Sequence, residues 1–453
     1  MNILITAPNF FPHSFGGGEI YVYRIAKELM KRGHNIAIMI SVKWRGGKGT
    51  YVVDRYHYEN IPVVTLSISP EAASFLERST GFGPQTFQII SEILNDFAPE
   101  IVHINGIKPA MVSLCNAMDI PHVVTVHHTG IVCPAGGLLR PDYSICGNPA
   151  NPHDCIPCCG YFKRPKWHIG GILGRIPTFI YRPLGKRLGQ SQKLSYFERG
   201  LIYPWLIEQV IIGEKIVLEQ AQLIIAPSLA MRDLLIRNGC DTSKIVVISH
   251  GIEPVSKGPF EDIKGRPIRF GYMGRIDPSK GLHIMLEAAE LLQDGPLFEL
   301  HIFGAARNPW DEEYRKKSLS GFRGKAKVFD HGLIAHDKLL EVFAKIDILV
   351  VPSILPEAFG LVVAEAFSAG RPVIVFNSGA LPEQVKDGVN GFIVERNDTR
   401  ALSEAMQKFI DNPDLVLDMS KQIFQVKTMQ EYVDEIEKIY SNIIHKQHEA
   451  VID

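Results

Sequence analysis

The sequence predicts an α/β protein built from two doubly wound, parallel-sheet domains. With 453 residues the chain is too long for one small core, and it suits two domains of about 200 residues each. Both halves alternate short apolar runs with stretches of helical periodicity, the pattern of repeated βαβ units. Between the halves, residues 254–267 contain three prolines and several charges, as a linker would. We therefore expect one domain over residues 1–253 and a second over 254–429.

The composition excludes several functional classes. The 48 basic and 49 acidic residues leave a net charge of -1, so no overall field favours nucleic acid. No apolar run approaches the ~18 residues of a membrane-spanning helix. Residues 1–7 enter a strand without a basic region or cleavage site, so we expect a cytoplasmic protein. Its seven cysteines then suggest reduced thiols or a metal site.

The N-terminal half begins with a βαβ unit whose glycine-rich turn opens a helix. A strand over residues 3–5 is followed by Gly16, Gly17 and Gly18, a helix ending near Gly33, and a strand over residues 36–40. Glycines in such a turn let the backbone approach a phosphate closely. The turn lacks the G-x-G-x-x-G pattern, and a glycine turn alone is more often a packing device than a site.

The rest of this half continues the alternation, with residues 42–60 interpreted as a loop and an edge strand. We expect a helix at 85–97 and strands at 100–105, 122–128, 223–228 and 245–252. His127 ends its strand, at the edge where open parallel sheets bind ligands. A single histidine in that position more often has a satisfied structural role.

Five cysteines gather in one loop: Cys133, Cys146, Cys155, Cys158 and Cys159. The first four are separated by 12, 8 and 2 residues, in a segment rich in Pro, Gly, Asn and Asp. That spacing predicts a structural, tetrahedral zinc site on Cys133, Cys146, Cys155 and Cys158, with His153 as a substitute ligand. An iron-sulfur cluster, free thiols and a disulfide are the alternatives.

A basic region follows the cysteines. Residues 161–200 carry nine Lys or Arg and one acidic residue, interleaved with aromatic and aliphatic side chains that continue to about residue 210. Such a composition suits the surface of an anionic membrane. The alternative is a solvated helical insertion packed on the first domain, and nucleic acid is the weakest candidate partner.

The C-terminal half places two cations after its first strand. We expect strands at 270–275, 299–304, 327–332, 347–353 and 373–376, and helices at 282–292 and 361–369. Arg275 and Lys280 lie in the turn before the first of these helices, where they could clamp a diphosphate. The alternative is a pair of exposed charges on an ordinary loop.

Two carboxylates flank the helix at 361–369. Glu357 lies in the loop after a buried strand, and Glu365 lies about two turns inside the helix. Helix N-termini attract phosphate, and ligands bind at the carboxyl ends of parallel strands. Carboxylates there can hold hydroxyls of a sugar and a ribose while the backbone holds phosphate. The alternative is a loop and helix with two surface glutamates.

The stretch from Glu357 to Glu365 resembles the E-x7-E motif of the family-4 retaining glycosyltransferases (glycosyl transferases group 1), notably those of bacterial surface-polysaccharide synthesis. The resemblance implies the GT-B fold, in which two Rossmann-like domains face each other across a cleft. The Cys-rich and basic segment at about 133–210 is the part least like a minimal member of this family, and we expect it to be an insertion in the first domain. A C-terminal helix at 430–447 would pack back on that domain.

The resemblance also assigns roles to residues. The donor diphosphate would be held by Arg275, Lys280, Gly17, Gly18 and the amides of Phe359, Gly360 and Leu361. Glu357 would hold sugar hydroxyls, Glu365 the ribose, and His127, in a T-x-H motif, would contact the donor sugar. His250 stands where the family usually has Asn, which leaves its role open.

Together these features predict a retaining hexosyltransferase that uses a nucleotide-diphosphate sugar and a glycan or lipid-linked acceptor. The chain has no D-x-D triplet, so cationic side chains would replace a catalytic metal and no cofactor is expected for catalysis. Residues 254–267 would serve as a hinge. The alternatives are a nucleotide-sugar epimerase on the same fold and a non-catalytic, sugar-binding scaffold of an assembly complex. A hydrolase would need an acid and nucleophile pair that is not evident.

Overall fold

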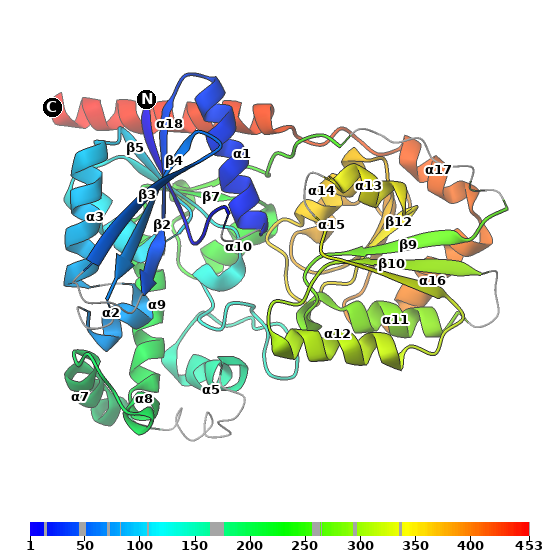
Figure 1. Ribbon diagram of the computed structural model, residues 1–453, viewed down its shortest axis with the longest axis horizontal. Coiled ribbons are helices and arrows are strands. Elements are labelled where there is room, and N and C mark those ends of the chain that lie inside the picture. The colour runs from blue at the N-terminus through cyan, green and yellow to red at the C-terminus, as the bar shows by residue number, and fades with distance from the viewer. Residues whose placement is uncertain are drawn as a thin grey trace. The chain divides into compact units, whose positions relative to one another are not determined.

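The chain divides into two compact units. The computed structural model describes residues 1–12, 16–44, 51–69, 73–81, 83–106, 108–163, 176–255, 263, 265–292, 297–334 and 338–452. Unit 1 comprises Met1–Ser249 and Met429–Asp453, and unit 2 comprises His250–Thr428 (Figure 1). The sequence had placed the first boundary at 253/254 and the second at 429/430. Most of the predicted hinge, residues 256–262 and 264, lies outside the described residues.

Unit 1 is built on an eight-stranded sheet in its described residues, with the order β3-β4-β2-β1-β5-β6-β7-β8. All neighbouring strands are parallel except β3 and β4. The strands are β1 (Asn2–Ala7), β2 (Asn35–Trp44), β3 (Tyr51–Tyr58), β4 (Ile61–Ile68), β5 (Ile101–Ile104), β6 (His122–Thr125), β7 (Leu223–Ala226) and β8 (Ile245–Val247). Central strands β5 and β6 are buried throughout, as expected for a sheet covered on both faces.

The segment after β2 differs from its prediction as a loop and an edge strand. β3 does lie at the edge of the sheet, but it forms a hairpin with β4, which lies between β3 and β2. Glu59 and Asn60 turn the hairpin with φ angles of 46° and 68°. Two successive residues with positive φ match the right-handed twist of the flanking strands. The local sequence does not mark this turn, because Glu59 and Asn60 include no glycine.

The helices of unit 1 cover the sheet and form a side lobe. They are α1 (Gly17–Lys31), α2 (Phe75–Thr80), α3 (Pro84–Phe97), α4 (Lys108–Ala117), α5 (Pro152–Lys163), α7 (Thr178–Gly189), α8 (Tyr196–Leu201), α9 (Tyr203–Gln220), α10 (Leu229–Arg237) and α18 (Met429–Ile452). None of the helices that the structure describes has the length and apolar character of a membrane span. Residues 164–175 of the predicted basic insertion lie outside the described part of the chain.

The helices α7 and α8 form a side lobe, which packs around Trp205 of α9. A Cβ added to Gly185 or Gly189 of α7 would lie 2.3 Å from the Trp205 ring, so both positions require glycine for this close approach. Tyr181, Leu194 and Ile202 complete the same small core. α7 and α8 are therefore fixed by one face each, with their opposite faces turned to solvent.

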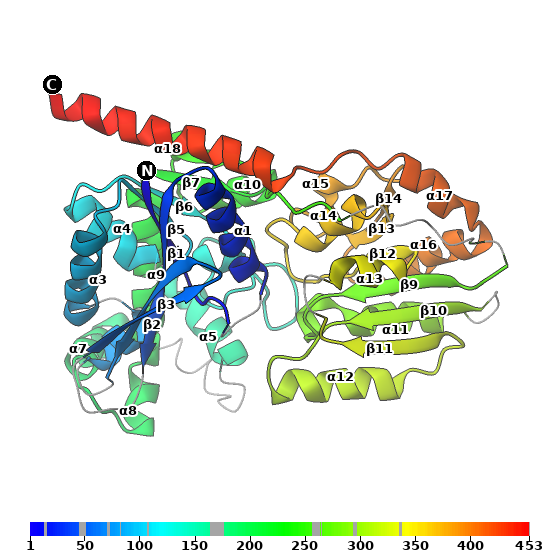
Figure 2. The same ribbon diagram turned by 45° about the horizontal axis from the view of Figure 1, so that its top comes forward.

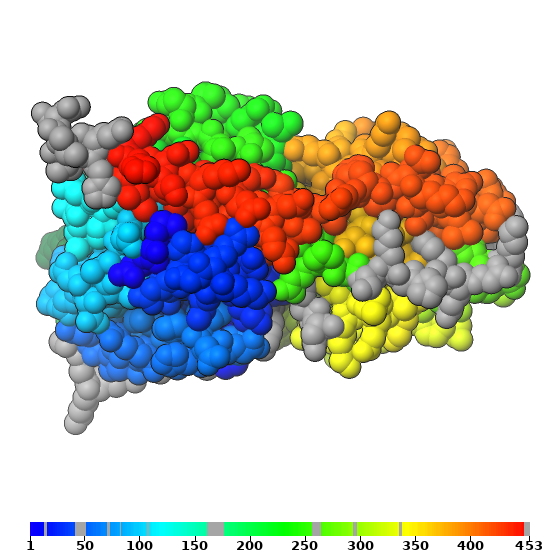
Figure 3. Space-filling view, turned by 90° about the horizontal axis from the view of Figure 1, so that it is seen from above, coloured from blue at the N-terminus to red at the C-terminus, as the bar shows by residue number. Residues whose placement is uncertain are grey.

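Helix α18 completes the core of unit 1. It runs along the unit beside α1, as Figures 2 and 3 show, and buries Tyr432, Val433, Ile436 and Tyr440 in the core that α1 and β1 share. The last helix of the chain is thus an integral part of the N-terminal unit.

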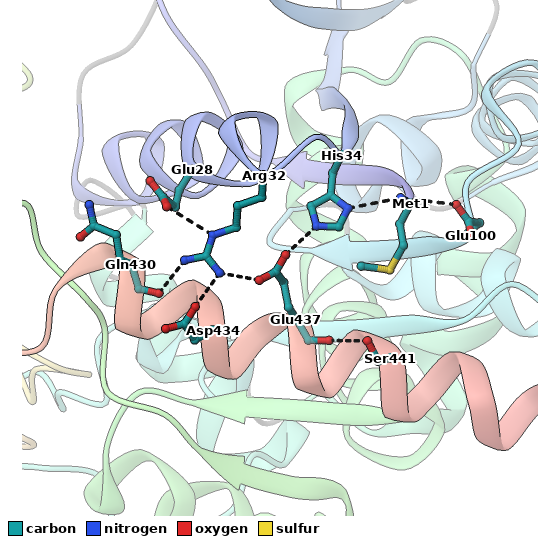
Figure 4. A network of polar contacts seen from close by, with 9 residues as sticks. All are labelled: Met1, Glu28, Arg32, His34, Glu100, Gln430, Asp434, Glu437 and Ser441. Carbon is teal, nitrogen blue, oxygen red and sulfur yellow. Dashed lines mark hydrogen bonds and ion pairs between the residues drawn. The ribbon is translucent and has the colours of Figure 1, made fainter.

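A network of charged groups fixes the outer side of this helix pair (Figure 4). The Arg32 guanidinium, just after α1, donates to Asp434 Oδ1 at 2.6 Å, to Glu437 Oε2 at 2.5 Å and to the Gln430 carbonyl at 3.0 Å. Glu437 also bonds His34 Nε2 at 2.6 Å. Burial raises the pKa of the Glu437 carboxyl, but its bonds with His34 and Arg32 outweigh burial and lower it.

Buried polar groups join α18 to the sheet as well. His103 of β5 contacts the Tyr440 hydroxyl through Nδ1 and the Thr125 hydroxyl through Nε2, each at 2.6 Å. Tyr21 of α1 shares a short hydrogen bond with Tyr432 of α18. Burial lowers the pKa of His103 to about 3, so this histidine is neutral at neutral pH.

Unit 2 contains a six-stranded, all-parallel sheet in its described residues, in the order β11-β10-β9-β12-β13-β14. The strands are β9 (Ile268–Met273), β10 (Phe298–Phe303), β11 (Lys327–Gly332), β12 (Ile348–Val351), β13 (Val373–Phe376) and β14 (Gly391–Val394). The helices are α11 (Leu282–Glu290), α12 (Pro309–Gly321), α13 (Leu339–Ala344), α14 (Leu361–Ser368), α15 (Leu381–Gln384), α16 (Thr399–Asp411) and α17 (Asp414–Lys421).

A buried ion pair closes the amino ends of the central strands in unit 2. Asp347, just before β12, is fully buried and accepts from Arg266 at 2.7 Å and 2.8 Å and from Arg269 at 3.1 Å. A buried carboxylate needs such partners, because leaving it unpaired is costly. The carboxyl ends of these strands lie at the opposite edge of the sheet, where the candidate residues of unit 2 are found.

The neutral state of His103 predicts a pH-dependent stability. Below pH 6.5 the unfolded chain binds a proton at this residue and the folded chain does not, so folding stability falls as the pH drops. Between pH 6.5 and 5 the loss should be about 2 kcal/mol. Denaturant unfolding at pH 6.5 and at pH 5 measures this loss of unfolding free energy. The loss in His103→Gln should be smaller than the loss in wild type by that amount. An equal loss of unfolding free energy in the two proteins would contradict the neutral state of His103.

Candidate functional site

The turn after β9 positions Arg275 and Lys280. Asp277 caps the short 3-10 helix η3 (Pro278–Lys280) by accepting from the Ser279 backbone N–H at 3.0 Å. The next residue, Gly281, has φ +74°, and an added Cβ would lie 1.9 Å from the Pro352 carbonyl. Only glycine fits there, and this fit brings Lys280 to the carboxyl end of β12.

Lys280 meets Glu357 at that end of the sheet. Lys280 Nζ lies 2.5 Å from Glu357 Oε1, and the Ser353 hydroxyl donates to the same oxygen at 2.8 Å. Both charged side chains are mostly buried, at 19% and 18% exposure. Burial raises the pKa of the Glu357 carboxyl, but Lys280, Ser353 and Arg275 outweigh it and hold the pKa below its ordinary value. Glu357 is therefore ionised at neutral pH.

Arg275 supplies the second cation. Its Nη2 lies 3.4 Å from Asp277 Oδ2, and the Tyr272 hydroxyl donates to the Arg275 carbonyl at 2.6 Å. The guanidinium is exposed and close enough for its charge to act on Glu357. Two cations, Arg275 and Lys280, and two carboxylates, Asp277 and Glu357, are thus gathered at the ends of β9 and β12.

The loop after Glu357 leads into the N-terminus of α14. Gly360, with φ +89°, precedes this helix, and no side chain caps its first turn. The Gln384 amide donates to the Phe359 carbonyl at 2.5 Å, and the Glu357 carbonyl accepts from Ala380 N–H at 2.9 Å. His250 packs against the Phe359 ring, with centroids 5.3 Å apart. The backbone of this turn is fixed, and the N-terminus of α14, which begins at Leu361, is the end of a helix that attracts anions.

Glu365 lies inside unit 2. It is 5% exposed in the second turn of α14. With Glu357 also mostly buried, the interpretation of both residues as surface glutamates is wrong. Carboxylates are buried only at a cost, so two of them in one stretch indicate a function for the stretch.

In unit 1 the comparable position is held by His127. Its Nε2 lies 2.6 Å from Asn105 Oδ1, and its ring packs edge-on against Tyr21 with centroids 4.5 Å apart. Asn105 follows β5, and its backbone N–H donates to Thr6 Oγ1 at 3.1 Å. Three strand ends and α1 therefore fix the orientation of this histidine.

Gly17 and Gly18 lie one turn before Tyr21, at the start of α1. No side chain caps this helix either, and its first turn contains Glu19 as an acidic residue. A Cβ added to Gly18 would meet no heavy atom within 4 Å among the described residues. Packing therefore does not require glycine at this position, and the start of α1 is open to a ligand.

Sequence reasoning missed two neighbours of these residues. Asn105 ends the strand expected at 100–105, but nothing in its local sequence reveals the pairing with His127. Lys108 opens α4 and acts electrostatically on His128, and burial lowers the pKa of the Lys108 amine to about 8. His128 accepts from Gly130 N–H at 2.9 Å and caps the 3-10 helix η1 (Thr129–Ile131).

The cysteine loop follows directly after η1. Burial raises the pKa of Cys155 and of Cys158 to about 11, and the neighbouring thiols Cys133 and Cys146 act on both. His153 is exposed and pairs with Asp154, while Cys159 is fully buried in the core beside α9. Within the described residues, no group of three or more His, Cys, Asp or Glu side chains is placed so that it could hold a metal ion.

The fold, two doubly wound parallel-sheet units, is that of GT-B glycosyltransferases, and two family models match the chain. Glycosyltransferase Family 4 matches residues 15–146, and Glycosyl transferases group 1 matches residues 259–426. The chain therefore belongs to the group 1, family 4 glycosyltransferases, and the predicted GT-B fold is confirmed.

Relatives and solved structures agree with that family. D-inositol 3-phosphate glycosyltransferase of Streptomyces scabiei is 29% identical over 222 residues, which cover 45% of this chain and 50% of the relative. The chain thus spans about half the length of this relative. Alpha-maltose-1-phosphate synthase of Mycolicibacterium smegmatis is 24% identical over 369 residues, 72% and 90% of the two chains. The structure of Anabaena HepE in complex with UDP and glucose is 17% identical in sequence, with a TM-score of 0.63. The match covers 97% of this chain and 99% of HepE. This last likeness shows the fold.

The Lys280–Glu357 pair predicts the stability of a variant. Lys280→Met leaves a mostly buried carboxylate without its cation and should cost about 1–3 kcal/mol of unfolding free energy at pH 7. Because the folded pKa of Glu357 is lowered, the pair stabilises above pH 4.5, and its contribution is lost as the pH falls through that lowered pKa.

Denaturant unfolding at several pH values measures this effect. The gap between wild type and Lys280→Met should narrow below pH 4.5. Lys316→Met is the matched control, because that exposed lysine lies 4.0 Å from Glu312 and should change stability little at any pH. A gap that stays constant down to pH 3 would show that the ion pair is not its cause.

Proposed function

We propose that this protein is a retaining glycosyltransferase that moves a sugar from a nucleotide-diphosphate sugar to a glycan or lipid-linked saccharide. We place its action in cell-surface polysaccharide synthesis, at the inner face of the cell membrane. The observation that carries the proposal is the group formed by Arg275, Lys280 and Glu357 at the carboxyl ends of β9 and β12.

The chemistry of sugar transfer requires such a group. As the bond between the sugar and the diphosphate breaks, positive charge develops on the sugar and negative charge on the diphosphate. Arg275 and Lys280 would stabilise the diphosphate together with the first amides of α14, and Glu357 would hold sugar hydroxyls. Two preorganised cations supply the charge that a metal ion supplies in other glycosyltransferases, so catalysis is proposed to be metal-independent.

The proposed transfer keeps the configuration at the anomeric carbon. The acceptor oxygen would bond that carbon on the face from which the phosphate oxygen leaves, and the acceptor proton would pass to the departing phosphate oxygen. His127, held by Asn105 and Tyr21, would contact the donor sugar, and Glu365 the ribose. Gly17 and Gly18 would meet the diphosphate, which the open space at Gly18 favours.

The side lobe supports a membrane-bound acceptor. Phe179 and Ile180 lie in the first turn of α7, and Tyr196 and Phe197 in the first turn of neighbouring α8, all of them exposed. Both pairs of apolar side chains are accompanied by exposed basic side chains of the same segment: Arg182, Lys186, Arg187, Lys193 and Arg199. Exposed aromatic and basic residues together favour the interface of an anionic membrane. We propose that this lobe binds the inner membrane surface.

Nucleotide binding tests the donor site. UDP, GDP, ADP or dTDP at ~100 times its dissociation constant should stabilise the protein by about 2.7 kcal/mol in thermal unfolding. UDP is the first choice, because HepE was solved with it. Arg275→Ala should lose most of the shift, and Lys421→Ala, which removes an exposed charge from α17, should keep it. If no nucleotide shifts the transition, the donor site is refuted and a scaffold role is favoured.

Vesicle sedimentation tests the membrane surface. Phe179→Ser/Phe197→Ser removes two side chains that are 75% and 72% exposed, so the fold should tolerate the change. Binding to phosphatidylglycerol vesicles should weaken by about 10-fold or more, since each phenyl ring contributes burial energy at the interface. Trp310→Ser, 66% exposed in unit 2, is the control and should bind as wild type does. Unchanged binding by the double variant would eliminate the proposed surface.

A further inference from the structure

The proposed transfer makes no use of the cysteine loop between η1 and α5. Its first turn is built around one sulfur atom. Gly136, with φ +96°, donates its N–H to the Cys133 carbonyl at 2.7 Å, and Leu138 N–H points to Cys133 Sγ at 3.4 Å. Leu138 itself has φ 52°, a left-handed conformation that costs free energy in a residue with a side chain. The strained turn aims a donor at a sulfur atom that could carry negative charge.

A short hairpin then returns the chain to the turn that contains Cys133. Leu139 and Ile145 form an antiparallel bridge, and Cys146 N–H donates to the Leu138 carbonyl at 2.7 Å. Cys146 is thereby paired with the turn that holds Cys133. Twelve residues separate the two cysteines in sequence, so their approach is a property of the folded loop.

Helix α5 brings the other two thiols. Cys155 and Cys158 are three residues apart and share one face of the helix. Cys158 Sγ lies 3.6 Å from the Leu139 carbonyl of the hairpin. Cys158 thereby meets the hairpin that leads from Cys133 to Cys146, and Cys155 lies one turn before Cys158 in α5. All four are partly buried and none is in a disulfide, whereas Cys115, Cys240 and the adjacent Cys159 are buried.

We propose that Cys133, Cys146, Cys155 and Cys158 bind one structural zinc ion as thiolates. The four come from a turn, a hairpin and a helix, which lets them approach one ion from different directions, as tetrahedral coordination requires. From Arg140 to Pro149 the loop is largely exposed, and it contributes little apolar area to a core. A metal ion would supply the cross-link that this segment otherwise lacks.

Binding exchanges hydrogen bonds for bonds to the metal. In the structure Cys146 Sγ lies 3.9 Å from the Asn148 carbonyl, and Cys158 Sγ lies 3.6 Å from the Leu139 carbonyl. Four sulfur–zinc bonds would form as four thiols lose their protons to solvent, and the charge of the ion would stabilise the thiolates. Zinc affinity should therefore fall as the pH is lowered.

Metal analysis of the full chain tests the proposal. Protein expressed with trace zinc and purified without a polyhistidine tag should contain one equivalent of zinc. Cys155→Ser/Cys158→Ser should lose nearly all of it, and Cys159→Ala, which changes the neighbouring core thiol, should keep it. Cobalt added to the metal-free chain should give the intense visible bands of tetrahedral cobalt thiolate.

A second measurement does not depend on the folding of a variant. In wild-type protein, zinc should protect the four loop thiols from iodoacetamide, and removal of zinc should expose them to it, as peptide mass spectrometry can show. Zinc absent from wild type, zinc retained by the double variant, or iron in its place would each overturn the proposal. These readouts do not involve sugar transfer, so they are independent of the proposed activity.

Discussion

The parallel direction of the strands is the constraint on which the candidate site depends. In a parallel sheet all carboxyl ends lie at one edge, so residues that follow different strands become neighbours without being close in sequence. Arg275 and Lys280 follow β9, and Glu357 follows β12, which pairs directly with β9. The buried contact between Lys280 and Glu357 spans 77 residues of sequence for this reason. Gly281 completes the arrangement, because a side chain there would separate the two strand ends.

In unit 1 the candidate residues also lie at the carboxyl ends of their own strands, but their support includes one further element, helix α18. His127 and Asn105 follow β6 and β5, and behind them the sheet buries two polar side chains, His103 and Thr125. Buried polar groups need partners, and α18 provides one for His103 through the Tyr440 hydroxyl, while its Tyr432 hydroxyl bonds Tyr21 of α1. The support of His127 therefore includes a helix that begins at residue 429. The charged contacts of Arg32 with Asp434 and Glu437 hold that helix in register.

Local sequence was enough for the alternation of strands and helices and for the strand-end positions of Arg275, Lys280 and Glu357. Apolar periodicity identifies the strands, and a charged residue after a buried strand must lie at the edge. The partners of these residues could not be predicted. Tyr21 and Tyr432 are 411 positions apart, and Asn105 and His127 are 22 apart on neighbouring strands. β4 was missed because Glu59 and Asn60 make a tight turn without the glycine that usually marks one.

The position of the cysteine loop gives its proposed zinc ion a consequence for the candidate site. Only η1 separates His127 from Cys133, and Thr129 in that helix donates its hydroxyl to the Gly136 carbonyl at 3.0 Å. The chain that leaves β6 is thus tied directly to the turn that points at Cys133 Sγ. A loop with little core of its own would allow the contact between Thr129 and Gly136 to fluctuate, whereas an ordered loop would restrain that contact. Zinc placed there would act on His127 through the backbone, without contacting the donor, by narrowing the range of positions open to the end of β6.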